Sequence, residues 1–245
     1  MATDALEPSR PTPDRPLVAP LRHTLIFLLI QVGLAAGGAY MQHRPGTGPS
    51  ATPEHPAMAP VYVFMIVLEW ALVYYVWVGL HQQKRIGILE LAGGRWKSWK
   101  DVWLDLVIAA PFWFVWEEAA QLMHNVLGAS HAKPIDALLP QGALEIMLWC
   151  VLSVSAGVCE EIVFRGYFQK QFQALTGSIV LAVLAQAVVF GIGHAYQGTK
   201  QVVVITGLGV LYGVLAAWRK NLRPGMIAHA WSDVYGGWMF KLLTK

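Results

Sequence analysis

Charged residues are scarce in this sequence: Asp, Glu, Lys and Arg together make up 13% of its 245 residues. A soluble domain of this size normally has about one quarter charged residues. Hydrophobic residues make up 56%, and they are grouped in long runs separated by polar segments. The shortage of charge therefore argues against an ordinary soluble domain and indicates a membrane protein. The tryptophans lie largely near the ends of the apolar runs, as interfacial anchors do.

Net charge and cysteine are also scarce. The formal net charge is only +3, and no basic stripe with interleaved aromatics is present, so nucleic acid is not an expected partner. The two cysteines, Cys150 and Cys159, share one apolar segment and would lie about 13 Å apart along a helix. That distance excludes a disulfide between them while the helix is intact. We interpret both as small buried hydrophobes.

The apolar runs predict an all-α, polytopic transmembrane helix bundle with about seven spans, in a range of six to eight. Residues 1–21, rich in proline and charge, are predicted to form a disordered tail. Residues 22–140 are expected to hold the N-terminal transmembrane helices, and residues 141–243 the remaining ones, in one integral membrane domain. The expected spans are 23–41, 60–80, 102–123, 141–164, 178–196, 202–218 and 224–243.

Lysine and arginine are unevenly distributed over such a bundle. If the N-terminus is inside, thirteen of the 18 basic residues fall on the inside and five on the outside. This bias follows the positive-inside rule. We therefore expect a multi-pass integral membrane protein with an internal N-terminus.

Several ionisable side chains lie inside the apolar runs, where each is costly unless it is paired or functional. They are Glu69, Glu117, Glu118, Glu160, Glu161, Arg165, His194, His229 and Asp233. Glu161 and Arg165 stand four apart with the acid first, which favours an intrahelical ion pair. Glu160 is turned away by roughly 100° and has no local partner, so it suits a general base. His229 and Asp233 are also four apart, so the acid can orient the imidazole, or both can face one point.

Three short motifs in this region resemble those of a known family. They are EEIVFR (Glu160–Arg165), FGIGH (Phe190–His194) and HAWSD (His229–Asp233). In this order they are similar to the EExxxR, FxxxH and HxxxN or HxxxD motifs of the CPBP family. This family contains CAAX prenyl proteases and bacteriocin-processing enzymes, which are intramembrane endopeptidases and are also called Abi proteins. The resemblance makes residues 141–243 the expected catalytic region and a bacterial inner membrane the expected location.

The resemblance implies a catalytic role for six residues: Glu160, Glu161, Arg165, His194, His229 and Asp233. Glu160, helped by His194, would activate water, while Arg165 would hold Glu161 and brace the site. The HxxxD pair would stabilise the oxyanion of the scissile amide.

Asp233 stands where many relatives have asparagine, and an ionised aspartate cannot donate a hydrogen bond to an oxyanion. Its carboxyl is then protonated, or it orients His229, or it helps to bind a metal. Glu160, His194 and His229 offer ligand types suited to Zn²⁺ with an open fourth position. No HExxH motif makes the zinc site specific. A zinc mechanism and a metal-free glutamate and histidine mechanism both stay open.

Chain counting gives a geometric expectation for the site. Thr176 follows Glu160 by sixteen residues and Gly177 precedes His194 by seventeen, so a hairpin at this turn would bring the two side chains level. His229 falls off this level in an ideal up-down bundle. A tilted helix or a break near Gly157 would reconcile the positions.

Other acidic residues fit supporting roles better. The pair Glu117 and Glu118 lacks an arginine at the fifth position, so it does not repeat the main motif. We expect it to line or support the catalytic cavity, or to mark the end of a helix at the interface. Glu69 is expected to form a hydrogen bond between helices.

The leading hypothesis is an intramembrane endopeptidase that hydrolyses a peptide bond of a membrane protein or peptide in the lipid bilayer. One alternative is a proton- or metal-coupled transporter, but this predicts inverted repeats, and none is seen in the sequence. Another is a non-catalytic immunity or scaffold protein, in which the motif residues should have drifted, whereas here they are present. The sequence does not reveal the substrate or whether it is prenylated.

Overall fold

The structure, a computed structural model, describes residues 16–43, 58–84, 86–128 and 139–243. All regular secondary structure in these residues is helical, which confirms the all-α prediction. A helix satisfies its backbone hydrogen bonds within its own segment, as a membrane requires. The helices are α1 (Leu21–His43), α2 (Ala59–Gln83), α3 (Ile88–Leu91), α4 (Trp99–Leu127), α6 (Ala143–Glu160), the π-helix η1 (Glu161–Phe168), α7 (Gln169–Thr176), α8 (Ile179–Gly193), the 3₁₀ helix η2 (Ala195–Gln197), α9 (Thr199–Arg219) and α10 (Arg223–Leu243).

Four helical segments of the described chain are long and apolar enough to cross a membrane. They are Leu21–Met41, Ala59–Gln83, Ala143–Thr176 and Thr199–Arg219. The apolar helix α8 has only 15 residues. The expected spans 102–123 and 224–243 do not qualify, because acidic and other polar residues interrupt α4 and α10. The structure thus supports an integral membrane protein but does not confirm about seven spans.

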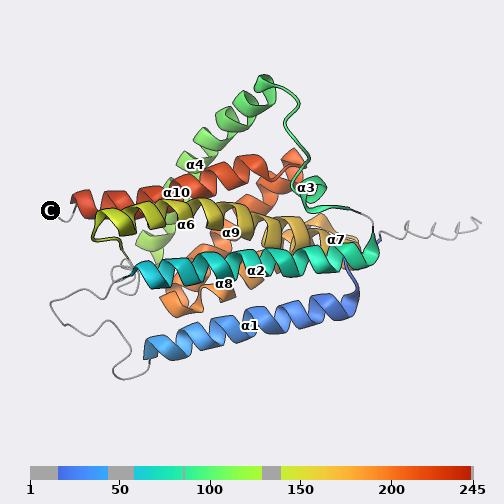
Figure 1. The fold of residues 1–245 in the computed structure, drawn as a ribbon, viewed down its shortest axis with the longest axis horizontal. Helices are drawn as coiled ribbons and strands as arrows, with labels where there is room; N and C mark the ends of the chain where they lie inside the picture. The colour runs from blue at the N-terminus through green and yellow to red at the C-terminus, as the bar shows by residue number, and fades with distance from the viewer. Residues whose placement is uncertain (1–15, 44–57, 85, 129–138, 244–245) are drawn as a thin grey trace, which may run out of the picture.

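Two of the three sequence motifs come together because α6 packs between α2 and α10. Figure 1 shows the axes of α1, α2, α6 and α10 lying roughly parallel, with the chain direction alternating between α1 and α2, while α4 crosses them at an angle. Helices α8 and α9 pack against each other, and α4 contacts both α9 and α10. Motif residues that are far apart in the sequence therefore meet in the interior of the bundle.

Helices α6, η1 and α7 form one continuous helical segment, and all eight residues of η1 are buried. It ends at Gly177, which has φ of +70° and so adopts the left-handed conformation that glycine tolerates best. The Ser178 hydroxyl then accepts a hydrogen bond from the Leu181 amide at 3.3 Å and caps α8. The predicted hairpin is present at this turn.

Gly157 allows α10 to approach α6 closely. A Cβ atom at this position would lie 2.7 Å from the Met226 carbonyl oxygen and 2.8 Å from the Ala230 nitrogen. Helix α6 runs through Gly157 without interruption, so of the two options, a tilted helix or a break near Gly157, the break is not the one that the structure shows. The small size of Gly157 instead permits the tight helix contact that is common in membrane bundles.

The segment 1–21, predicted to be a tail, is ordered at its end. Residues 1–15 lie outside the described residues. The backbone amides of Val18 and Ala19 donate hydrogen bonds to Oε1 of the buried Gln171, at 2.9 and 3.2 Å. A glutamine about 150 positions later in the chain therefore holds Val18 and Ala19 against the bundle, while the predicted tail at 1–15 falls outside the described residues.

Candidate active site

The Glu161–Arg165 ion pair lies in the interior of the bundle, on η1. Arg165 Nη1 donates to Glu161 Oε1 at 2.9 Å, and the two side chains are 0% and 1% exposed. The predicted intrahelical pair is thus present. Burial removes both charges from water, so each depends on the other for compensation.

Two aromatic rings enclose the Arg165 guanidinium. Its Cζ atom lies 4.3 Å from the centroid of Phe190 and 5.1 Å from that of Tyr212. Arg165 Nε and Nη2 have no hydrogen-bond partner among the described residues. Cation–π contacts of the Arg165 guanidinium with these two rings therefore replace further hydrogen bonds. Phe190, the first residue of the FxxxH motif, thus covers the buried Arg165 guanidinium. The sequence reasoning missed this role.

His229 of α10 connects the ion pair to the candidate base. Its Nδ1 lies 3.2 Å from Glu161 Oε1, and because an ionised carboxylate only accepts, this nitrogen carries the proton. Its Nε2 consequently faces Glu160 Oε2 at 3.5 Å. Glu161 therefore holds both Arg165 and the imidazole, rather than Arg165 alone.

Glu160 is the last residue of α6, one position before the π-helix. Its side chain is 23% exposed, yet its Oε2 atom is buried and has no hydrogen-bond partner among the described residues. A buried polar atom without a partner is costly and is common at functional sites. This carboxylate is available to a water molecule or a substrate.

His194 lies at the end of α8 and contributes a second imidazole. Its Nδ1 is 2.9 Å from the Phe190 carbonyl oxygen, which can only accept, so Nδ1 donates and a neutral ring keeps a lone pair on Nε2. Both His194 and His229 stand edge-on to the Phe190 ring, with centroids 4.8 and 6.2 Å away. Both imidazoles therefore contact the same aromatic ring, although they come from different helices. Within the described residues no ion pair joins His194 to Glu160.

Asp233 lies at the edge of this group. Its Oδ2 is 3.9 Å from His229 Nε2, which is too far for a hydrogen bond. Its side chain is 36% exposed. The contact that orients the imidazole therefore comes from Glu161 and not from Asp233.

Glu117 of α4 contacts the same helix as the HxxxD motif. Its Oε1 accepts a hydrogen bond from the Ser232 hydroxyl at 2.6 Å, beside Asp233. Glu118, the next residue, is exposed. The geometry places Glu117 as a support for α10, in line with one of the two expected roles.

Two further side chains surround the candidate base. Glu69 of α2 lies within hydrogen-bonding reach of Ser155 on α6 and interacts electrostatically with Glu160. Tyr196 stacks on His194 with ring centroids 6.2 Å apart and also interacts with Glu160. The sequence offered a signal for Glu69, an acid in an apolar run, but none for Tyr196 beyond its position two residues after His194.

The expected zinc ligands do not form a metal site in this arrangement. Among the described residues, no group of three His, Cys, Asp or Glu side chains is placed to hold a metal ion. His229 approaches Glu160, but His194 does not complete a ligand set with them. The donors as positioned do not fit zinc, and we derive no step through a metal.

Comparison with known families gives one match. Residues 142–235 match the family described as type II CAAX prenyl endopeptidase Rce1-like, and all six predicted catalytic residues lie within this segment. Comparison with curated proteins and with solved structures gives no match. At the family level, the matched domain indicates a CAAX-type intramembrane protease, and peptidase activity generally. This segment of the chain therefore supports the resemblance to the CAAX-protease, or CPBP, family that the three motifs indicate.

Proposed function

We propose that the protein is an intramembrane endopeptidase that hydrolyses a peptide bond of a membrane-associated protein or peptide. The observation that carries this proposal is the buried Oε2 atom of Glu160, which has no hydrogen-bond partner among the described residues. It lies beside His229 in the domain that matches the family. A buried carboxylate oxygen without a hydrogen bond is costly in a membrane protein, and such groups mark functional sites.

Glu160 and His194 activate the attacking water in this proposal. The Glu160 carboxylate accepts a proton from water, while the lone pair on His194 Nε2 accepts a hydrogen bond from the same water and orients it. The oxygen then attacks the carbonyl carbon of the scissile amide. The proton moves from Glu160 to the amide nitrogen, the C–N bond breaks, and a carboxylate and an amine are released.

His229 and Asp233 stabilise the oxyanion that forms in this step. In this proposal His229 carries a proton on both ring nitrogens: Nδ1 donates to Glu161, which fixes the direction of the ring, and Nε2 gives the developing negative charge a donor. Asp233 adds a second donor when its carboxyl carries a proton. Glu161 and Arg165 brace the site without contacting substrate.

The mechanism operates without a metal ion. We expect cleavage to survive exhaustive treatment with a chelator, because all proposed proton transfers use side chains of the chain itself. Metal analysis of the purified protein, measured together with activity, checks this expectation. Stoichiometric zinc that is lost together with activity would contradict it.

The substrate reaches this site through the lipid bilayer. We propose an internal N-terminus and a bacterial inner membrane, supported by the excess of lysine and arginine on one side of the bundle. The family description refers to a CAAX prenyl substrate, whereas the proposal requires only a membrane-associated peptide bond.

Comparative proteomics tests the proposed activity. Membranes of cells that produce the wild-type protein or Glu160→Gln are compared, and a membrane peptide with a new terminus is expected only with the wild type. The same new terminus at equal abundance with the variant would contradict the assignment of Glu160. The absence of any new terminus, together with ion uptake by liposomes containing the protein, would favour a transporter.

A further inference from the structure

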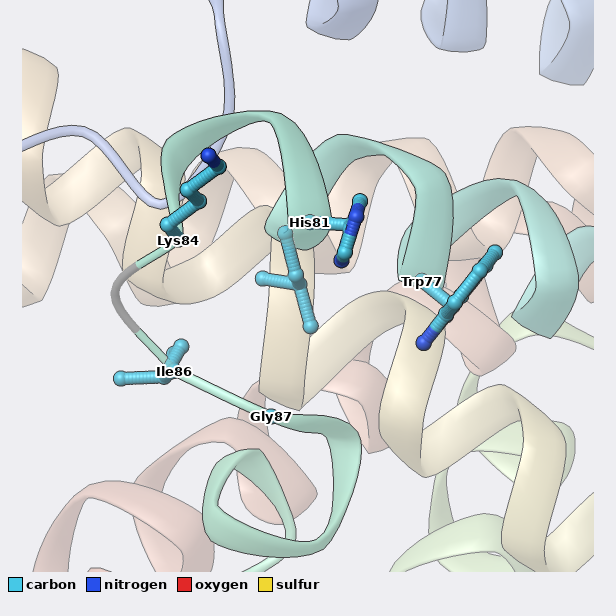
Figure 2. Close-up of a pocket in the computed structure, with 6 residues that line it drawn as sticks. Trp77, His81, Lys84, Ile86 and Gly87 are labelled. Carbon is cyan, nitrogen blue, oxygen red and sulfur yellow. The ribbon is translucent and has the colours of Figure 1, made fainter.

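A cavity of about 230 Å³ lies at the C-terminal end of α2. It is lined by six residues: Trp77, Leu80, His81, Lys84, Ile86 and Gly87. Figure 2 shows Trp77, His81 and Lys84 following one another along the end of α2, whereas Ile86 and Gly87 belong to the segment that leads to α3. The spacing of four and three residues places the first three side chains along one side of the helix. The cavity therefore combines aromatic, cationic and aliphatic walls.

The aromatic wall has the composition of a membrane interface. The ring centroids of Tyr74 and Trp77 are 5.5 Å apart, and those of Trp77 and His81 are 5.3 Å apart, both in stacked geometry. Tyr74 and Trp77 are 64% and 44% exposed, at the end of a helix long enough to span a membrane. Because Trp and Tyr concentrate at the level of lipid headgroups, we place the cavity at this depth.

Lys84 brings a positive charge to the cavity. It ends α2 in the left-handed conformation, and its backbone amide donates to the carbonyl oxygens of Leu80 and His81 at 3.0 and 3.2 Å. These bonds satisfy carbonyl groups that would otherwise repel an anion at a helix C-terminus. The backbone of Lys84 is thus fixed next to the cavity, and its ammonium group can compensate a negative charge there.

Two other cations at this end of the bundle, Lys170 and Arg223, have partners. Lys170 Nζ donates to the Leu91 carbonyl at 3.1 Å, and Arg223 Nε pairs with Asp105 at 2.9 Å. For Lys84 no ion pair with a carboxylate occurs in the part of the chain that the structure describes. An anionic ligand would supply the missing charge.

We propose that this cavity binds the phosphate group of an anionic phospholipid, with Lys84 as its counter-ion. Leu80 and Ile86 line the apolar part of the cavity and suit the glycerol backbone. The exposed faces of Trp77 and Tyr74 extend from it along the membrane-spanning helix, where an acyl chain would lie. A free phosphate uses only the cation, so this apolar surface favours a lipid as the source.

Native mass spectrometry of the full-length protein in detergent tests the proposal, with phosphatidylglycerol, phosphatidylcholine and inorganic phosphate as separate probes. Wild type is expected to retain phosphatidylglycerol in preference to phosphatidylcholine. Lys84→Gln should weaken phosphatidylglycerol binding about fivefold, since one basic residue near the surface contributes that much to anionic lipid binding. Lys84→Arg keeps the charge and should bind like wild type.

Lys97→Gln is the matched control, because Lys97 is exposed in the same polar segment and does not line the cavity. The proposal is overturned if the two glutamine variants lose lipid equally, if neither does, or if phosphatidylcholine binds as well as phosphatidylglycerol. Inorganic phosphate that displaces the lipid at equal occupancy would identify free phosphate as the ligand instead. The readout is binding, so the result is independent of the proposed peptidase activity.

Discussion

Replacing Glu160 with Gln, or His194 with Ala, is expected to lower kcat for substrate cleavage by about 10²- to 10⁴-fold, the usual contribution of general acid–base catalysis. Glutamine has nearly the size and shape of glutamate but cannot take a proton from water. The affected oxygen, Glu160 Oε2, has no hydrogen-bond partner among the described residues. Its ion-pair contact among the described residues is with His229 Nε2 at 3.5 Å, and Glu161 holds this imidazole as well, so the variant should fold and insert into membranes.

His194→Ala removes the lone pair that Nε2 directs away from the Phe190 carbonyl. If both residues act on one water molecule, they form one catalytic unit. The fold-decreases in kcat of the two single variants then do not multiply in the double variant. The double variant should then be only slightly slower than the slower single variant. Two independent contributions would instead multiply, so the double variant separates the two cases.

Glu118→Gln is the matched control for this series, because Glu118 is exposed on α4 and receives the same chemical change. Its kcat and KM should equal those of the wild type. Steady-state kinetics on the substrate identified by proteomics, with each variant checked for insertion and folding, supplies the measurement. Wild-type kcat in either Glu160→Gln or His194→Ala would remove that residue from the mechanism.

The parts of the site that could be predicted are those that depend on local spacing. Glu161 and Arg165 are four residues apart, so a helix of almost any kind places them on one face, and they form the expected ion pair. The turn at Gly177 was also predictable, because a glycine followed by serine commonly ends one helix and caps the next. That the hairpin brings Glu160 and His194 level remains a prediction.

The parts that could not be predicted depend on contacts between distant segments. Glu161 and His229 are 68 residues apart, and their hydrogen bond requires α10 to pack closely on α6. The π-helix η1 lies entirely in the buried core, and its hydrogen bonds are not specified by local spacing. The number of about seven spans is not confirmed either, since an apolar run does not reveal whether acids such as Asp105 interrupt it for a structural purpose.

Asp105 illustrates this last point. It is 1% exposed and binds Trp96, Asn221 and Arg223 at the end of α4. A buried aspartate lowers the hydropathy of α4 below that of a typical transmembrane helix. The same aspartate joins α4 to the segments that hold Trp96 and Arg223. In the sequence, Asp105 was only one charge at the start of an apolar segment.

Arg165→Leu is expected to lower the free energy of unfolding by about 3–5 kcal/mol, the usual cost of removing one partner of a buried ion pair. Glu161 would be left as a buried charge, with a side chain only 1% exposed. The rings of Phe190 and Tyr212 would also lose the cation that lies between them. Thermal or chemical unfolding of the purified protein in detergent gives the difference.

Arg219→Leu is the control for this change. Arg219 is 23% exposed and lies 3.6 Å from Asp105, which keeps Arg223 and Asn221 as partners. Such a partly exposed pair is worth roughly 0–1 kcal/mol. Equal destabilisation by the two arginine variants would contradict the special cost of the buried pair.

The double variant Glu161→Leu/Arg165→Leu separates stability from positioning. Removing both charges avoids leaving one unpaired, and replacing a buried ion pair by apolar residues is often neutral or stabilising. The double variant should therefore recover much of the stability lost in Arg165→Leu. It should remain inactive, however, because the hydrogen bond from His229 Nδ1 to Glu161 is gone and the imidazole no longer points at Glu160. Recovery of cleavage together with stability would mean that Glu161 serves folding alone, and that His229 finds its orientation without it.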